Sequence, residues 1–218
     1  AKNLGIEIKY SYVVVAAKGY KKVKSADIAK ISDNKKDLSN IENIECDCIC
    51  VSGFWTPSIH LASQSGNKSE FNEKIDAFIP KKSKQKENTI GSANGKFTLE
   101  ETINEAFDKG YEVSNKITEN NNKVSIPTVV EKKSTEHDKF WCVPLPKGKS
   151  YKRFLDFQND VAVTDIELAL REGFRSIEHV KRYTTLGMAT DQGKTSNLNG
   201  LQLVSDIENK VVPQVGHT

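Results

Sequence analysis

The most regular pattern in this chain lies at residues 156–197, which read DFQNDVAVTDIELALREGFRSIEHVKRYTTLGMATDQGKTSN. Thr164 and Glu167 have the spacing of a capping box ahead of a short amphipathic run, and Gly173 follows that run. This arrangement predicts one helix with a defined start and stop. The polar, glycine-containing end of the stretch carries many groups that can donate hydrogen bonds to an anion.

More helices are predicted around this one. The first runs from Ser176 to Gly187 and the second from Asn197 to Asn209, while residues 210–218 predict an extended tail. Residues 139–146 predict a short strand that two prolines interrupt. Because the 176–187 helix has fewer apolar than polar positions, this helical unit is expected to be small and to need neighbours for burial.

The first part of the chain predicts strands. Residues 12–16 form a β-branched run that Gly19 closes, which predicts a strand, a turn and a second strand. Residues 35–43 are polar and predict a loop. Residues 44–51 are nearly all apolar or cysteine and predict a strand buried on both faces. The basic run within residues 68–88 predicts a solvated loop.

Residues 91–117 predict a glycine turn followed by a long helix, with Thr98 and Glu101 as its capping box. Five apolar side chains at helical spacing predict a buried stripe: Leu99, Ile103, Ala106, Val113 and Ile117. Residues 120–139 are polar and predict a linker, so the chain divides into one unit before them and one after them.

Composition excludes several classes of protein. The chain has 32 basic and 29 acidic side chains, and its net charge of +3 is too small for a protein whose main partner is nucleic acid. No apolar run approaches the roughly 18 residues that a membrane span needs. The N-terminus lacks the pattern of a signal peptide, so we expect a cytoplasmic protein without nucleic-acid or membrane partners.

The cysteines do not predict a metal site. Cys46, Cys48 and Cys50 alternate, so in an extended strand their thiols form a row on one face. A zinc site needs about four ligands that converge from separate segments, and Cys142 adds no C-x-x-C pair. The expectation is reduced, buried, structural cysteines and no bound metal.

Two segments resemble a known enzyme family. CDCICVSGFWTP (residues 46–57) and GSANGKFTLEETINEAFDKG (residues 91–110) are similar to the C-terminal part of the nucleotide-binding domain of pyridine nucleotide-disulfide oxidoreductases. Residues 156–197 look like the alpha subunit of heterotetrameric sarcosine oxidase. The resemblance implies an α/β fold in which residues 1–119 are the C-terminal part of an NAD-binding domain.

The same resemblance implies a small, mostly helical domain at residues 140–209, after the linker at 120–139. The tail at 210–218 is then expected to lead toward an aminomethyltransferase-like domain. No G-x-G-x-x-G follows a predicted strand, so the main pyrophosphate cradle is missing and we expect a fragment of a longer subunit.

The helical domain is also similar to domains that carry a two-iron two-sulfur cluster in bacterioferritin-associated ferredoxins and amine dehydrogenases. Their four ligand positions fall here on Asp156, Gln158, Asp191 and Ser196. None is a cysteine, and oxygen donors are poor ligands for such iron, so no cluster is expected.

The polar groups around these positions suit a phosphate instead. The resemblance places this domain beside a flavin-bearing beta subunit and implies that it helps to enclose FMN. The expected contacts are Lys181, Arg182, Thr184, Thr185, Gln192, Lys194, Thr195 and Ser196, with Gly193 allowing close backbone approach. The alternative is that Lys181 and Arg182 are solvated cations at a helix end.

The glycine turn before the long helix can face a pyrophosphate. The resemblance implies a bound NAD there, with Gly91, Ser92, Ala93 and Phe97 as contacts. The alternative is an ordinary turn and helix cap.

The resemblance also implies the activity of the complete enzyme. Sarcosine is demethylated with oxygen to glycine and hydrogen peroxide, and the one-carbon unit passes to tetrahydrofolate; FAD and tetrahydrofolate bind outside this segment. No catalytic residue is assigned here, since Asp156, Asp165 and His179 have structural alternatives. The isolated chain is expected to be inactive, with the beta subunit and the other subunits as partners.

Two other functions stay open. One is a non-catalytic module that only docks onto a partner subunit. The other is the alpha subunit of a related amine or opine dehydrogenase, in which cysteines are expected at the four cluster positions.

Overall fold

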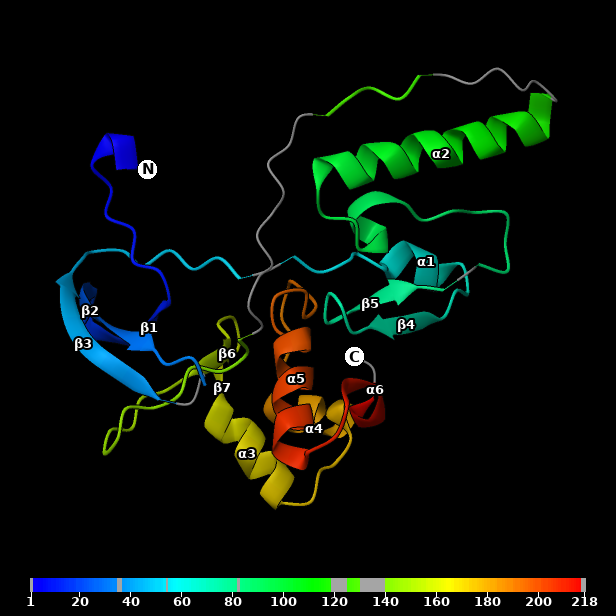
Figure 1. The fold of residues 1–218 in the computed structure, drawn as a ribbon. Coiled ribbons are helices and arrows are strands. Elements are labelled where there is room, and N and C mark those ends of the chain that lie inside the picture. The colour runs from blue at the N-terminus through cyan, green and yellow to red at the C-terminus, as the bar shows by residue number, and fades with distance from the viewer. Residues whose placement is uncertain are drawn as a thin grey trace. The chain divides into compact units, whose positions relative to one another are not determined.

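The computed structural model describes residues 2–34, 37–53, 55–81, 83–118, 125–129 and 140–216 (Figure 1). Two compact units form: Ala1–Ser52 together with Asp138–Thr218, and Gly53–His137. The predicted domain boundaries at residues 119 and 139 fall outside the described residues and stay predictions.

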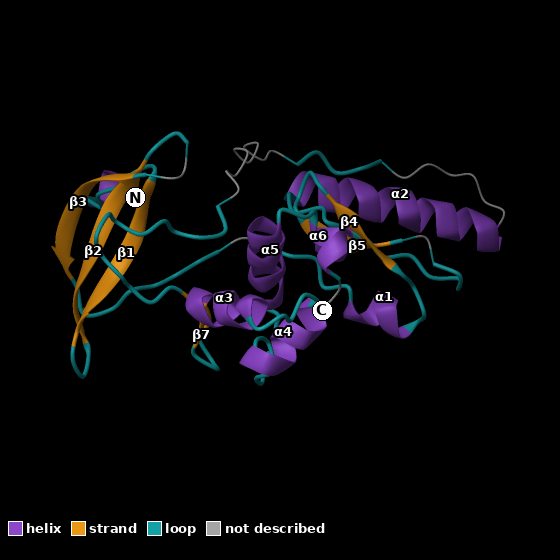
Figure 2. Ribbon diagram, turned by 90° about the horizontal axis from the view of Figure 1, so that it is seen from below, coloured by secondary structure: helices purple, strands orange, loops and turns teal. Residues whose placement is uncertain are grey.

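The first unit begins with a short 3-10 helix, η1 (Lys2–Leu4), and an antiparallel sheet (Figure 2). Its strands lie in the order β1 (Tyr12–Gly19), β2 (Val23–Ile31) and β3 (Leu38–Glu45). The predicted strand, turn and strand are confirmed. Gly19 has a φ of 151°, and a Cβ there would lie 2.0 Å from the carbonyl oxygen of Lys22, so glycine is required at this turn.

The predicted loop at residues 35–43 is wrong for residues 38–43, which belong to β3. They pair with β2, and Asp27 lies opposite Asn43. Asn43 Nδ2 also donates a hydrogen bond to Asp27 Oδ1 at 2.8 Å. Cross-strand partners therefore override a polar composition that by itself indicates a loop.

The predicted strand at residues 44–51 is wrong beyond its first residues, because β3 ends at Glu45. The N–H of Cys46 still donates to the carbonyl of Lys24, the second residue of β2, at 3.1 Å. Since β2 begins one residue earlier, Cys48 and Cys50 lie beyond the end of the sheet and are exposed. The cysteines are free thiols, but they are not buried.

The described residues of the second unit form two α-helices, one 3-10 helix and two strands. They are α1 (His60–Gln64), β4 (Ser69–Asn72), β5 (Ala77–Pro80), the 3-10 helix η2 (Gly91–Asn94) and α2 (Leu99–Thr118). β4 and β5 pair as an antiparallel hairpin, so the loop predicted for residues 68–88 is wrong at residues 69–80. Phe71 and Phe78 lie opposite each other with ring centroids 5.3 Å apart, a cross-strand pair that stabilises the hairpin.

The long helix α2 confirms the predicted helix and its capping box. The N–H of Glu101 donates to Thr98 Oγ1 at 3.2 Å, and the N–H of Thr98 donates to Glu101 Oε2 at 3.4 Å. Its predicted buried stripe is wrong for this chain, because Leu99 is 55% and Ile117 is 76% exposed. Helical spacing indicates which side chains share a face, but not whether another element covers that face.

The rest of the first unit is mostly helical. It contains β6 (Phe154–Asp156), β7 (Val161–Ala162), α3 (Val163–Arg171), α4 (Ile177–Thr184), α5 (Asn197–Glu208) and α6 (Val212–Val215). The three predicted helices are confirmed as α3, α4 and α5. Their apolar faces form a core in which Ile166, Ile177, Val180, Leu186, Leu201 and Val204 are almost completely buried.

Three local predictions for this segment are wrong. Asp165, not Glu167, completes the N-terminal cap of α3, because its Oδ2 accepts the N–H of Ala162 at 2.8 Å. The described residues 140–146 form no strand. The tail is not fully extended, since α6 forms where Val212 and Val215 are buried.

A pair of glycine substitutions tests the packing of the helical core. Replacing Gly200 with alanine should lower the free energy of unfolding by about 1–3 kcal/mol, because overpacking strains a dense core. The new Cβ would lie 2.3 Å from Cδ2 of Leu186, which is completely buried. Urea unfolding followed by circular dichroism measures the change.

Gly110→Ala is the matched control, because nothing lies within 4 Å of a Cβ at that position in α2. It should stabilise the helix by about 0.5–1 kcal/mol. Equal effects of the two substitutions would show that Gly200 is not a packing contact.

Candidate functional site

The buried carboxylate of Asp156 lies where β6 ends and is 2% exposed. Its Oδ1 accepts the backbone N–H of Gln158 at 2.9 Å and of Asn159 at 3.2 Å. Its Oδ2 accepts the N–H of Gly187 at 2.8 Å and the hydroxyl of Ser196 at 3.4 Å. One side chain therefore joins the turn after β6 to both ends of the segment between α4 and α5.

The other positions that the resemblance aligns with cluster ligands are also hydrogen-bonded. Thr190 Oγ1 donates to Gln158 Oε1 at 2.7 Å. Asp191 accepts the N–H of Gly193 and both the hydroxyl and N–H of Thr195, and these bonds, that of the Thr195 hydroxyl first, hold the pKa of Asp191 below its ordinary value. In the described part of the chain, no three histidine, cysteine or acidic side chains are grouped to hold a metal.

Two glycines bring the loop after α4 against the start of α5. Gly187 has a φ of 64° and Gly193 a φ of 77°, and a Cβ on either would overlap the side chain of Asn197. The Oδ1 atom of Asn197 is buried and has no hydrogen-bond partner among the described residues. Asn197 Oδ1, at the start of α5, is therefore a buried acceptor that no described residue supplies with a donor.

The hydroxyls predicted to contact FMN bond within the protein. Thr184 Oγ1 donates to the carbonyl of Val180 at 2.8 Å, and Thr185 Oγ1 donates to the carbonyl of Thr184 at 2.6 Å. Thr195 and Ser196 donate to the two aspartates described above. Each hydroxyl has one proton, and in this conformation that proton is donated within the protein and stabilises the loop.

The predicted cations lie at the end of α4 and in the following loop. Arg182 pairs with Glu178 at 2.9 Å on the same helix. Lys181 is half-buried and Lys194 is exposed, as is Gln192, whose φ of 52° is left-handed. Neither lysine forms an ion pair with another described residue. Of the three predicted cations, these two are therefore the ones that are free to bind an anion. The predicted FMN contact stays a prediction.

The turn predicted to face NAD is held by a carboxylate that the sequence did not single out. Gly91, which is buried with a φ of 65°, donates its N–H to Glu105 Oε2 at 2.7 Å. Asn94 Nδ2 donates to Glu105 Oε1 at 2.7 Å. The Gly91 N–H is therefore already bonded, while Ser92 and Phe97 are exposed and Ala93 half-exposed. The NAD contact also stays a prediction.

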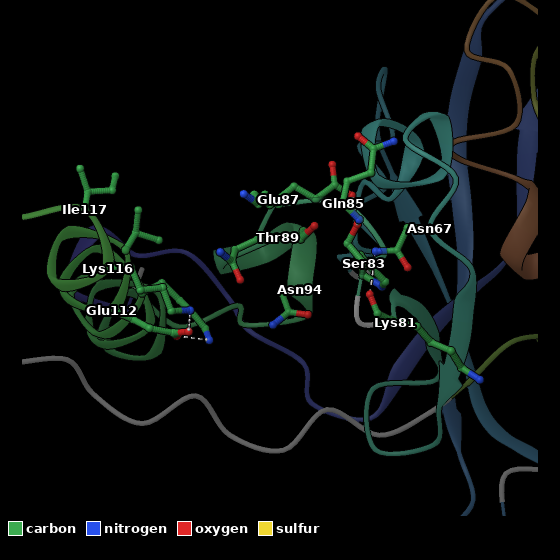
Figure 3. Close-up of a pocket in the computed structure, with 15 residues that line it drawn as sticks. Asn67, Lys81, Ser83, Gln85, Glu87, Thr89, Asn94, Glu112, Lys116 and Ile117 are labelled. Carbon is green, nitrogen blue, oxygen red and sulfur yellow. Dashed lines mark hydrogen bonds and ion pairs between the residues drawn. The ribbon is translucent and has the colours of Figure 1, made fainter.

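A pocket of about 930 Å³ lies in the second unit, between the segment after β5 and the C-terminal half of α2 (Figure 3). The basic run predicted as solvated loop therefore lines a cavity. Its charged lining consists of Lys81, Lys86, Lys109, Lys116, Glu87 and Glu112. Asn67 donates to the carbonyl of Lys81 at 2.6 Å, which fixes one wall.

Three of these six charged side chains pair with one another within the pocket. Glu112 accepts from Lys109 at 2.8 Å and from Lys116 at 2.7 Å, and the two ammonium groups lower the pKa of Glu112 to about 2. Hydrogen bonds from Ser65 and Ser83 lower the pKa of Glu87. The paired lysines are therefore only weakly available to an anionic ligand.

Comparison with known proteins bears on the C-terminal segment first. Residues 150–218 match the family model described as the sarcosine oxidase A3 domain. The chain is 33% identical over 178 residues to a sarcosine oxidase alpha subunit of Rhizobium meliloti (strain 1021), which covers 81% of this chain. It is 30% identical over 209 residues to one of Corynebacterium sp. (strain U-96), which covers 89% of this chain. The predicted resemblance is confirmed.

The chain spans only about a fifth of these sarcosine oxidase alpha subunits, 18% of the first and 20% of the second. The similarity therefore concerns one part of such a subunit. Within that part, the network around Asp156, Gln158, Asp191 and Ser196 lies in the segment that matches the A3-domain model.

The fold is similar to that of L-proline dehydrogenase from P. horikoshii, with a TM-score of 0.51 and 19% identity. The match covers 94% of this chain and 41% of that one. Together with the mixed strands and helices, it confirms the predicted α/β fold class. Among the described helices, none combines the length and hydropathy that a bilayer crossing requires.

Replacing Asp156 with asparagine tests the network of the A3 domain. We expect the free energy of unfolding to fall by about 2–3 kcal/mol, because an amide presents one acceptor atom and its NH2 group faces existing donors. Chemical denaturation measures this. Asp160→Asn is the control, since Asp160 is exposed with a left-handed φ of 53° that asparagine also adopts. A loss of similar size in both variants would contradict the assignment.

The ion pairs of Glu112 in the pocket make the stability of the fold depend on pH. The folded pKa of Glu112, about 2, lies below the ordinary value of 4.5, so its ion pairs stabilise the fold fully above that ordinary value. This contribution should be lost as the pH falls from 4.5 toward 2. A carboxyl-carbon NMR titration should show no Glu112 transition near pH 4.5. In the Lys109→Gln, Lys116→Gln double variant, the transition should move upward; an unchanged midpoint would rule out the two lysines as its cause.

Proposed function

We propose that this chain is part of a sarcosine oxidase alpha subunit. The complete enzyme would demethylate sarcosine oxidatively to glycine and hydrogen peroxide and pass the one-carbon unit to tetrahydrofolate. The observation that carries the proposal is the 33% identity over 178 residues to a sarcosine oxidase alpha subunit. The A3-domain match at residues 150–218 supports it independently.

The proposed contribution of the A3 domain is to the FMN site at the interface with a beta subunit. Lys181 and Lys194 are free of ion pairs in the described part of the chain, and two left-handed residues, Gln192 and Gly193, shape the loop between them. These groups suit a phosphate, and the flavin ring of FMN would supply electron transfer. Thr184, Thr185, Thr195 and Ser196 then act as supports of the loop, because their hydroxyls are already donated.

The proposed contribution of the preceding segment is NAD binding at the turn before α2. Glu105 fixes that turn through Gly91 and Asn94, so a dinucleotide would reach it from the side of Ser92 and Phe97. We assign no catalytic residue to this chain. Asp165 caps α3 and His179 is an exposed side chain on α4, which supports structural rather than chemical roles.

A second candidate function is docking onto a partner subunit without cofactor binding. The exposed apolar side chains of α2 favour it, with Leu99 55% and Ile117 76% exposed. The dehydrogenase alternative has less support, because the cluster positions hold no cysteine and two of them, Asp156 and Ser196, hydrogen-bond to each other.

Calorimetric titration of the chain with FMN, with NAD and with a flavin-free beta subunit separates these functions. We expect FMN binding that Lys194→Gln weakens about tenfold, the effect of losing one charge-assisted contact worth about 1.4 kcal/mol. Lys152→Gln is the control, since Lys152 is exposed in the same segment but lies beside the ring of Phe154. Binding of the beta subunit with no response to either cofactor would favour docking instead.

A further inference from the structure

Two exposed thiols lie close together beyond the end of the first sheet. The Sγ atoms of Cys48 and Cys50 are 3.9 Å apart, and one of the two thiols donates to the other. The sulfur atoms of a disulfide are about 2.0 Å apart, a distance that rotation of exposed side chains can close. Both residues follow the last residue of β3, Glu45, and belong to no helix or strand.

The other two cysteines are held differently. Cys46 is half-buried, and its N–H is bonded to the carbonyl of Lys24, which ties it to the sheet. Cys142 accepts a hydrogen bond from Arg153 Nη1 at 3.1 Å, and burial raises the pKa of its thiol. The pair at 48 and 50 is therefore the one that combines proximity, exposure and freedom to move.

We propose that Cys48 and Cys50 are a redox-active pair that a hydroperoxide oxidises to an intramolecular disulfide. The thiolate of one cysteine attacks one peroxide oxygen, the O–O bond breaks, and a sulfenic acid and hydroxide form. The sulfur of the other cysteine then attacks the sulfenic sulfur, the S–S bond forms and water leaves. In total, two thiols lose two electrons and two protons to one hydrogen peroxide, which becomes two waters.

The Cys50 sulfur raises the pKa of the Cys48 thiol, first through the hydrogen bond and then through its charge. Either sulfur can make the first attack, and the other, 3.9 Å away, resolves the intermediate. A bridge across one intervening residue is short and exposed, so thiol reductants should reverse it readily.

Mass spectrometry of the full chain tests the pair. The folded protein is treated with hydrogen peroxide, denatured and alkylated with iodoacetamide. The untreated protein should carry four alkyl groups, one on each cysteine, and the treated protein two, with the missing pair mapped to Cys48 and Cys50. Dithiothreitol should restore all four. Four alkyl groups after treatment, a bridge that includes Cys46, or a bridge between two chains would overturn the proposal.

Serine variants separate the roles of the sulfurs. Cys46→Ser should still lose two alkylation sites on oxidation, because Cys46 takes no part. Cys48→Ser and Cys50→Ser should each form no disulfide, and dimedone should trap a sulfenic acid at the remaining thiol of the pair in at least one of them. A disulfide in either variant, or no adduct in both, would contradict the proposal. Circular dichroism of each variant checks that it folds, and these exposed positions should tolerate the change.

Discussion

The helical part of this protein depends on one buried carboxylate. Asp156 accepts four hydrogen bonds, from the turn after β6 and from both ends of the α4–α5 connection. A charged group that is 2% exposed is stable only when such donors replace water. The packing of α3, α4 and α5 around Ile166 and Leu186 positions those donors, so the apolar core and the polar network require each other.

The polar network sets which groups of this segment can bind a ligand. Asp156 accepts the N–H of Gln158 and the hydroxyl of Ser196, and Asp191 accepts the hydroxyl of Thr195. The hydroxyl protons of Thr195 and Ser196 are therefore already donated within the protein. A phosphate proposed at this surface would consequently rely on Lys181 and Lys194, which is why the lysine variants test it better than threonine variants do.

Several features of the fold and the candidate site followed from local pattern. The capping box of α2 and the stop of α3 at Gly173 each depend on residues within one or two turns, and both were predicted. Features that depend on distant partners were missed. β3 forms because β2 pairs with it, and Glu105 bonds to Gly91 across 14 residues of sequence.

Residue order alone was thus enough to predict the helices, the family resemblance and the absence of cysteine from the cluster positions. These features depend only on spacing and on side-chain chemistry. Three-dimensional packing was needed to show that Cys48 and Cys50 are exposed, that the stripe of α2 is uncovered and that the hydroxyls predicted to contact FMN are donated within the protein. Burial and hydrogen-bond pairing are properties of atoms brought together from separate segments, and no local pattern encodes which segments meet.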